Sequence, residues 1–133
     1  MLDFFETVAK AIADPTRIRI LKLLEGGETC VGQITTVLDL APATVSKHLA
    51  ALRAAGLLQQ RRHGKWKYYR LAERELNPYA HQFLALIRKA MTDDPIIIED
   101  GILLTRTALS SRACPPNVEQ MAGDTVANNV RWL

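Results

Sequence analysis

Apolar residues recur every three to four positions along most of the first 56 residues, which predicts a series of short amphipathic helices. The first is predicted over residues 2–12. Asp14 and Pro15 begin the second, because aspartate caps a helix N-terminus and proline fits the first helical position. This second helix carries apolar side chains around much of its circumference, and Gly26-Gly27 ends it. We therefore expect it to be buried on most sides.

A pair of helices joined by a tight turn follows. The first helix of the pair covers roughly residues 30–38, the turn covers residues 39–41, and Pro42 begins a longer helix that Gly56 ends. Three apolar side chains of the longer helix recur at i, i+4 and i+7 and are predicted to face the core: Val45, Leu49 and Leu52. This arrangement is a helix-turn-helix, a unit with a known use on DNA.

After Gly56 the pattern changes to two short strands, Leu57–Arg61 and Trp66–Leu71, with His63-Gly64 as the turn between them. Asn77 and Pro78 then begin another helix, which covers roughly residues 78–91. The order of four helices, two strands and one helix predicts a mainly α fold with a small β-hairpin. It is the order of a winged helix-turn-helix, in which the hairpin over residues 57–71 is the wing.

The periodic signal weakens after residue 91. Asp93-Asp94-Pro95 is predicted to break the helix, and the apolar clusters at 96–98 and 102–104 are short. We therefore expect one winged helix-turn-helix domain over residues 1–91 and a C-terminal extension, without assigned structure, over residues 92–133.

The cations are concentrated in one part of the chain. The net charge is +3, but residues 1–39 carry −2, residues 40–72 carry +7 and residues 73–133 carry −2. The middle segment contains no acidic residue. Such a block is typical of a surface that binds a polyanion. The alternative is a solvated face that binds nothing, which the complete lack of acid over this segment disfavours.

The helix that begins at Pro42 presents small residues, hydroxyls and one cation away from the core. Such a face fits closely into a DNA major groove and can hydrogen-bond to base edges or phosphates. We predict DNA contacts from Pro42, Ala43, Thr44, Ser46, Lys47 and His48. His48 lies between the inward and outward directions, and a hydrogen-bonded contact between helices is its first interpretation.

The wing supplies a second set of candidate contacts. Four of its cations are predicted to reach phosphates or the minor groove: Arg61, Arg62, Lys65 and Lys67. Trp66, Tyr68 and Tyr69 lie among them, and we expect most of these aromatic rings to pack the wing onto the helices.

Other classes of function receive less support. An enzyme is not indicated, because the chain has no His-Glu-x-x-His, no Gly-rich phosphate loop and no plausible nucleophile triad. A winged-helix module that binds only protein is the alternative, and it predicts an acidic or apolar outer face on the helix after Pro42. No apolar run reaches the roughly 18 residues that span a bilayer, and residues 1–10 lack the pattern of a signal peptide. We expect a cytoplasmic protein without a membrane partner.

Three segments together resemble the ArsR/SmtB family of bacterial winged-helix repressors: AIADPTRIRILKLL, VGQITTVLDLAPATVSKHLAALRAAGLL and RRHGKWKYYRL. The resemblance covers residues 5–91. It implies a homodimer, built by the first and last helices, that binds a palindromic operator in double-stranded DNA. It also implies repression that an inducer relieves, often a metal or metalloid ion. Residues 1–91 would then serve both DNA binding and dimerisation.

The sensor sites of that family are incomplete in this chain. Arsenic-sensing members carry Cys-Val-Cys at the start of the third helix, where this chain has Cys30-Val31-Gly32. Soft ions favour two or three thiolates. Of the zinc-sensing ligands only His81 stands at a matching position. Cys30 and Cys114 remain as candidates for a soft metal or metalloid site. The alternatives are a redox pair of these cysteines, an unidentified ligand of the extension, or a regulator without a metal sensor.

Overall fold

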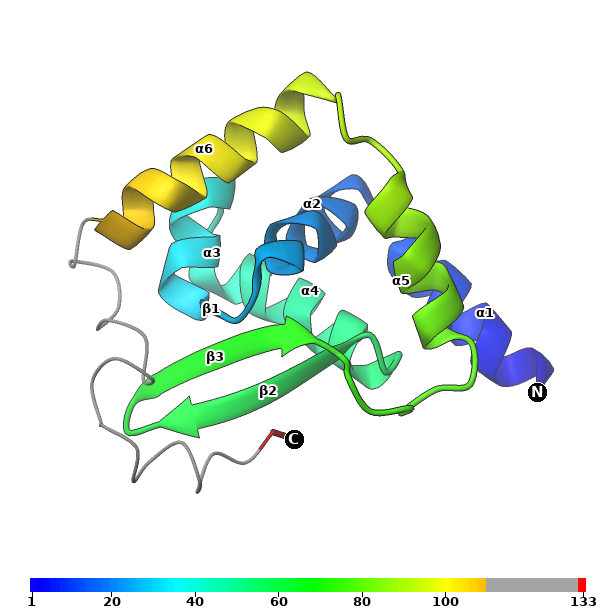
Figure 1. The fold of residues 1–133 in the computed structure, drawn as a ribbon. Helices are drawn as coiled ribbons and strands as arrows, with labels where there is room; N and C mark the ends of the chain where they lie inside the picture. The colour runs from blue at the N-terminus through cyan, green and yellow to red at the C-terminus, as the bar shows by residue number, and fades with distance from the viewer. Residues whose placement is uncertain (110–131) are drawn as a thin grey trace.

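The computed structural model describes residues 1–109 and 132–133, and it is a winged helix-turn-helix (Figure 1). The elements in chain order are α1 (Leu2–Ile12), α2 (Pro15–Leu23), the 3-10 helix η1 (Leu24–Gly26), β1 (Thr29–Cys30), α3 (Val31–Leu38), α4 (Pro42–Ala54), β2 (Leu58–His63), β3 (Trp66–Leu71), α5 (Ala80–Lys89) and α6 (Pro95–Leu109). Every predicted helix and strand is confirmed. Two elements, β1 and α6, were not predicted.

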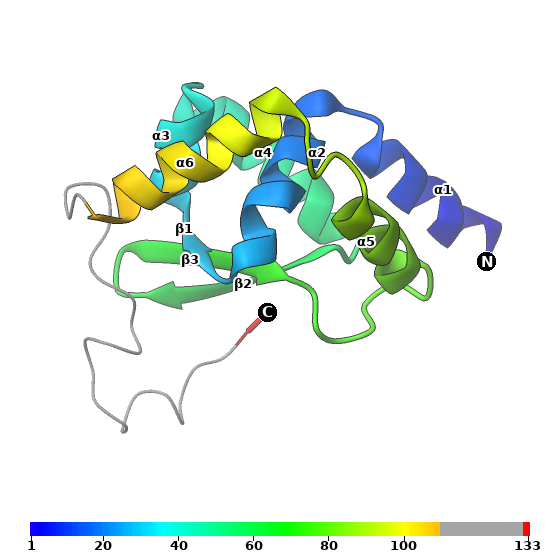
Figure 2. The same ribbon diagram turned by 45° about the horizontal axis from the view of Figure 1, so that its top comes forward.

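The helices lie on one face of a small antiparallel sheet (Figures 1 and 2). Helix α1 lies beside α5 at one end of the molecule, where the ring of Phe5 contacts those of Tyr79 and Phe83 at centroid distances of 5.3 Å each. The core between helices and sheet contains side chains from α1 to α5. Its fully buried large members include Ile20, Leu21, Leu24, Ile34, Leu49, Leu52, Leu57 and Leu58.

Helix α2 is the central helix, and its three cations each bond to a different helix. Arg17 Nε donates to Nδ1 of His48 on α4 at 3.2 Å. Arg19 forms a two-bond ion pair with Asp100 on α6, at 2.8 and 2.9 Å. Lys22 Nζ donates to the carbonyls of Ile87, Arg88 and Ala90 at the end of α5. A cation at a helix C-terminus is favoured by the helix dipole.

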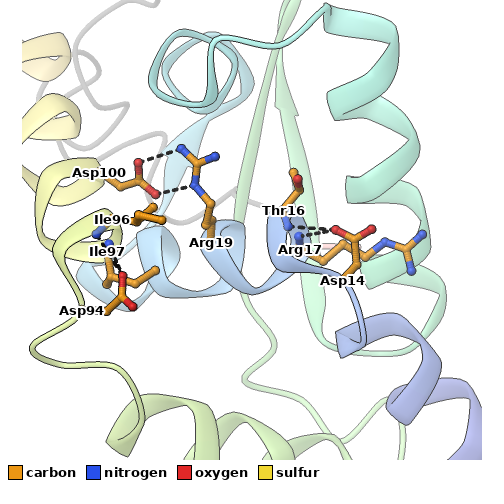
Figure 3. A network of polar contacts seen from close by, with 8 residues as sticks. All are labelled: Asp14, Thr16, Arg17, Arg19, Asp94, Ile96, Ile97 and Asp100. Atoms are coloured by element: carbon orange, nitrogen blue, oxygen red, sulfur yellow. Dashed lines mark hydrogen bonds and ion pairs between the residues drawn. The ribbon is translucent and has the colours of Figure 1, made fainter.

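Helix α6 lies in the C-terminal extension, to which no structure was assigned from the sequence. Asp94 Oδ1 accepts the backbone N–H groups of Ile96 and Ile97 at 2.9 and 3.3 Å, so it caps the helix that begins at Pro95. Asp14 caps α2 in the same way, at 2.8 and 3.2 Å (Figure 3). The break predicted at Asp93-Asp94-Pro95 is present, since α5 ends at Lys89, but the same Asp-Pro signal that was recognised at Asp14 was not recognised at Asp94 as the start of a new helix.

The sheet has the strand order β1-β3-β2, with both pairs antiparallel. Strand β1 was missed because a strand of two residues has no periodicity that a sequence can show. The pairing of His63 with Trp66 places the wing turn at Gly64-Lys65, one residue later than predicted. None of the helices within the described residues combines the length and hydropathy that a membrane span needs.

Gly56 joins α4 to β2 at a point of close approach. Its φ is +76°, and a Cβ built there would lie 2.9 Å from Cβ of Asn77. Asn77 is itself buried and tied down, since its amide donates to the carbonyl of Phe4 at 3.1 Å and accepts from the N–H of Tyr79 at 2.9 Å. Asn77 therefore cannot move away from an added Cβ at Gly56 without breaking these hydrogen bonds.

We expect Gly56→Ala to lower the free energy of unfolding by about 2 kcal/mol or more, since strained backbone and a steric clash add. Chemical denaturation followed by circular dichroism measures the change. Gly64→Ala is a matched control, because φ is +61° there but a Cβ meets nothing within 4 Å. An equal loss in both variants would show that the contact with Asn77 contributes nothing.

Candidate nucleic-acid interface

The N-terminal half of α4 forms an exposed face without acid. Pro42 occupies the first turn, which contains no acidic residue. The exposed side chains of this half are Pro42, Ala43, Thr44, Ser46 and Lys47. Val45, Leu49 and Leu52 anchor the opposite side of the helix in the core, each with 0% exposure. The core thus fixes which face of α4 points outward, and that face is the one predicted to contact DNA.

His48 lies at the edge of this face and is half-buried. It accepts the bond from Arg17 described above, so its first interpretation, a hydrogen-bonded contact between helices, is confirmed. Arg17 was not among the residues predicted to contribute to the site. Figure 3 shows that Arg17 and Arg19 point to opposite sides of α2, toward different partners. The spacing of two residues, about 200° around an α-helix, is the signal that could have separated the two arginines.

Two cations face each other across the wing. Arg62 on β2 stands directly opposite Lys67 on β3, so both side chains project from the same face of the hairpin. Like charges in directly opposed positions destabilise an antiparallel pair. Among the described residues neither side chain has an acidic partner within an ion-pair distance. An uncompensated pair of this kind indicates a surface shaped for an anion.

Lys65 extends this cationic surface to the tip of the wing. It lies in the turn, is exposed, and places its Nζ 5.1 Å from the ring centroid of Trp66. A contact with an aromatic face holds a cation without neutralising it. We call Lys47, Arg62, Lys65 and Lys67 the open cations.

Arg61 corrects the sequence-based set, because its side chain does not belong to that surface. The residue is 3% exposed. Its guanidinium makes two bonds to the carboxylate of Glu28, one of them from Nε to Oε2 at 3.0 Å. It also lies 4.4 Å from the ring centroid of Tyr68. Alternation along β2 turns Arg61 to the opposite face from Arg62, where Glu28 neutralises it.

The other cations of the basic segment are also engaged within the chain. Arg70 pairs with Glu73 at 3.3 Å and donates twice to Oε1 of Gln59. Arg53 donates to Oε1 of Gln60 at 2.9 Å. The acids that neutralise Arg61 and Arg70 come from outside residues 40–72. The binding surface is therefore narrower than the charge of that segment suggests.

The aromatic residues of the wing are mostly structural, as expected. Tyr68 and Tyr69 are buried, and Trp66 is half-buried. Burial raises the pKa of both tyrosines above the ordinary value. The phenols stay neutral at physiological pH, so they add no negative charge to the cationic surface.

The structure describes one of the two proposed soft-metal ligands, Cys30. Cys30 is buried at 1% exposure, and its Cα pairs with that of Tyr68 on β3. Cys114 lies outside the described residues. Within residues 1–109 and 132–133, no three His, Cys, Asp or Glu side chains gather as a metal site would require. A soft ion that needs several thiolates does not fit these residues alone.

The comparisons with known proteins agree with this geometry. A family model described as "Bacterial regulatory protein, arsR family" matches residues 14–60. The transcriptional repressor SdpR of Bacillus subtilis is 36% identical over 86 residues, which are 65% of this chain and 96% of that protein. This chain belongs to the arsR family of bacterial regulatory proteins. That family consists of DNA-binding regulators, which supports the expectation that the chain is not an enzyme.

Two further arsR relatives bear on function. The arsenic resistance transcriptional regulator ArsR1 of Pseudomonas putida is 41% identical over 87 residues, 65% of this chain and 64% of that protein. A solved homodimeric winged helix-turn-helix DNA-binding domain from Mycobacterium bovis is 37% identical, with a TM-score of 0.56. It covers 65% of this chain and 77% of that one. The chain thus spans slightly less than two thirds of the length of ArsR1.

Alanine substitutions of the two adjacent arginines of the wing, Arg61 and Arg62, should have different effects on the free energy of unfolding. Arg61→Ala leaves the Glu28 carboxylate without its partner, and we expect a loss of about 3 kcal/mol in the free energy of unfolding. Arg62→Ala relieves repulsion with Lys67, so its stability should equal or slightly exceed that of the wild type. Urea denaturation compares the two. Equal destabilisation would contradict the assignment of Arg61 to structure and Arg62 to binding.

Proposed function

We propose that this chain is a dimeric, sequence-specific DNA-binding transcriptional repressor that acts in the cytoplasm. The observation that carries the proposal is the opposed pair Arg62 and Lys67, which no described acid neutralises, together with the acid-free exposed face of α4. Repulsion between two like charges costs folding stability, and the binding of a polyanion at the same surface compensates for that cost. The similarity to the transcriptional repressor SdpR supports the proposal that this binding represses transcription.

The two parts of the surface have different roles in this proposal. Ala43, Thr44, Ser46 and Lys47 enter the major groove, where small residues allow close approach and polar groups meet base edges. Pro42 begins the helix at the groove, and His48 lies at its border. The wing cations Arg62, Lys65 and Lys67 contact phosphates or the adjacent minor groove. Arg61 supports the wing from its other face.

Dimerisation is proposed through α1 and α5. Both helices expose large apolar side chains, with Leu2 78% and Leu86 63% exposed, and Phe4 and Phe5 about half exposed. A symmetric pair would bury these side chains and would place two copies of α4 on a palindromic site. The homodimeric domain from Mycobacterium bovis supports this arrangement.

The function is tested by fluorescence anisotropy with duplexes tiled from the upstream region of the gene, against a scrambled duplex, at several salt concentrations. We expect selective, salt-sensitive binding. Arg62→Ala with Lys65→Ala should reduce the slope of log K against log salt by about two per subunit, at about 0.9 for each phosphate contact.

Arg74→Ala with Arg106→Ala is the matched control, because it removes the same charge from exposed positions outside α4, the wing and the helices proposed for dimerisation. An equal change in the salt slope for both double variants would show that the wing cations do not contact DNA phosphates. No preference over scrambled DNA would overturn the repressor and would favour the alternative, a winged-helix module that binds protein.

A soft metal or metalloid inducer is the finer part of the proposal. The name of ArsR1 supports it, and Cys30 with Cys114 would supply the thiolates. Cys30 alone does not satisfy such an ion, so the second cysteine is essential to this form of the proposal. A regulator without a metal sensor is the alternative.

We expect arsenite to weaken operator binding by about tenfold or more if it is the inducer, a coupling of ordinary size for an allosteric effector. Anisotropy titrations with and without arsenite measure this, with Cys114→Ser expected to abolish the response. Release that persists in Cys114→Ser would exclude the two-cysteine site. No release in the wild type would exclude arsenite.

A further inference from the structure

The outer edge of the wing is occupied by a distant part of the same chain. The strand order leaves β2 with one edge free of β1 and β3, and such an edge presents unpaired N–H and C=O groups. Gln60 N–H donates to the carbonyl of Leu133 at 2.9 Å, and Leu133 N–H donates to the carbonyl of Gln60 at 2.6 Å. Two residues that exchange both bonds form the hydrogen-bonded pair of an antiparallel ladder.

Trp132 occupies a slot beside that edge. Its ring centroid lies 4.2 Å from the guanidinium carbon of Arg70 and 5.2 Å from that of Arg61. Arg61 in turn lies over Tyr68, so aromatic rings and guanidinium groups alternate across the outer face of the sheet. The ring of Trp132 also packs against the buried pair of Cys30 and Tyr68. The slot that holds Trp132 therefore has an apolar floor, formed by Cys30 and Tyr68, and cationic walls, formed by Arg61 and Arg70.

The walls of this slot are held independently of Trp132. Glu28 fixes the guanidinium of Arg61, while Gln59 and Glu73 fix that of Arg70. A site whose groups are already ordered loses less entropy when its occupant binds. The free edge of β2 and the slot together have the two parts of a strand-addition site: backbone bonds and one side-chain pocket.

Gln60 connects this site to the recognition helix. Its backbone holds Leu133, while its side-chain Oε1 accepts a bond from Arg53 on α4 at 2.9 Å. The same oxygen lies 3.5 Å from the hydroxyl of Tyr69. One residue of β2 thus joins the added segment, the middle strand of the sheet and α4.

We propose that the free edge of β2 and the slot between Arg61 and Arg70 form a docking site for Trp132 and Leu133 of the same chain, and that docking orders the wing for DNA. The docking of Trp132 and Leu133 does not depend on DNA binding. Its effect on the affinity for DNA rests on the proposed function. Docking adds no cation to the DNA-facing surface, so it acts by ordering the wing and not by charge.

Hydrogen exchange of the Gln60 amide, followed by NMR on the full chain without DNA, tests the docking. We expect Trp132→Ala to speed this exchange by about tenfold or more, because the amide then faces water. Arg70→Gln should also speed it, since one wall of the slot is lost. The amide of Leu49 in the core of α4 reports global stability and should not change.

Arg74→Gln is the matched control, since it removes the same charge from an exposed side chain four residues from Arg70. Docking is overturned if Gln60 exchanges equally fast in wild type and Trp132→Ala, or if Arg74→Gln has the effect of Arg70→Gln. Protection of Gln60 that grows with protein concentration would assign the segment to a second copy and would overturn docking within one chain.

Anisotropy then tests the consequence for DNA. Trp132→Ala should weaken operator binding by about three- to tenfold, the cost of ordering the wing on binding, with an unchanged salt slope. Lost protection at Gln60 with unchanged affinity would overturn the ordering role. If the wild type binds no DNA selectively, the repressor proposal fails while the exchange result still decides the docking.

Discussion

Helix α2 is packed against other helices on most of its circumference, so each of its cationic side chains has to find a partner on another element. A buried charge without a partner is costly. Arg17, Arg19 and Lys22 meet this requirement on α4, α6 and α5 respectively. One helix thereby sets the positions of the recognition helix, the helix that covers α2 and α3, and the helix proposed for dimerisation. The apolar core supplies most of the stability, and these polar bonds specify how the helices are arranged.

The two faces of the hairpin separate wing cations that acids neutralise from wing cations that the proposed function assigns to DNA binding. On the outer face Glu28 and Glu73 neutralise Arg61 and Arg70. On the other face Arg62 and Lys67 lie opposite each other, and no acid among the described residues pairs with either. The neutralised arginines, Arg61 and Arg70, stabilise the sheet. The opposed cations, Arg62 and Lys67, lower its stability and create a positive surface. Charge along the sequence therefore overstates the binding surface, because strand alternation sends neighbouring arginines to opposite environments.

The outer face of the wing links these two roles. Arg61 and Arg70 bridge acids on one side and the ring of Trp132 on the other, while Gln60 carries the edge of β2 and contacts Arg53 of α4. The wing and the recognition helix are thus parts of one connected unit. Changes at the edge of β2 have a physical route to α4 that does not pass through the DNA-facing side chains.

The sequence by itself determined the elements whose signals are local. Capping by Asp14, the period of Val45, Leu49 and Leu52, and the glycine in the wing turn lie within a few residues of what they specify, so the helix-turn-helix and the wing were predicted. The outward face of α4 followed from the same period. Of the four wing cations selected from the sequence, Arg62 and Lys65 are exposed and Lys67 is half-buried, whereas Arg61 is buried.

Only the tertiary structure decided which charges are neutralised and where α6 lies. Glu28 is 33 residues from Arg61, and Asp100 is 81 residues from Arg19, so no local pattern connects them. Helix α6 has a proper cap, yet its apolar face became recognisable only against α2 and α3. The physical reason is general to this chain: backbone conformation depends on neighbours in sequence, whereas the partner of a buried charge is chosen by neighbours in space.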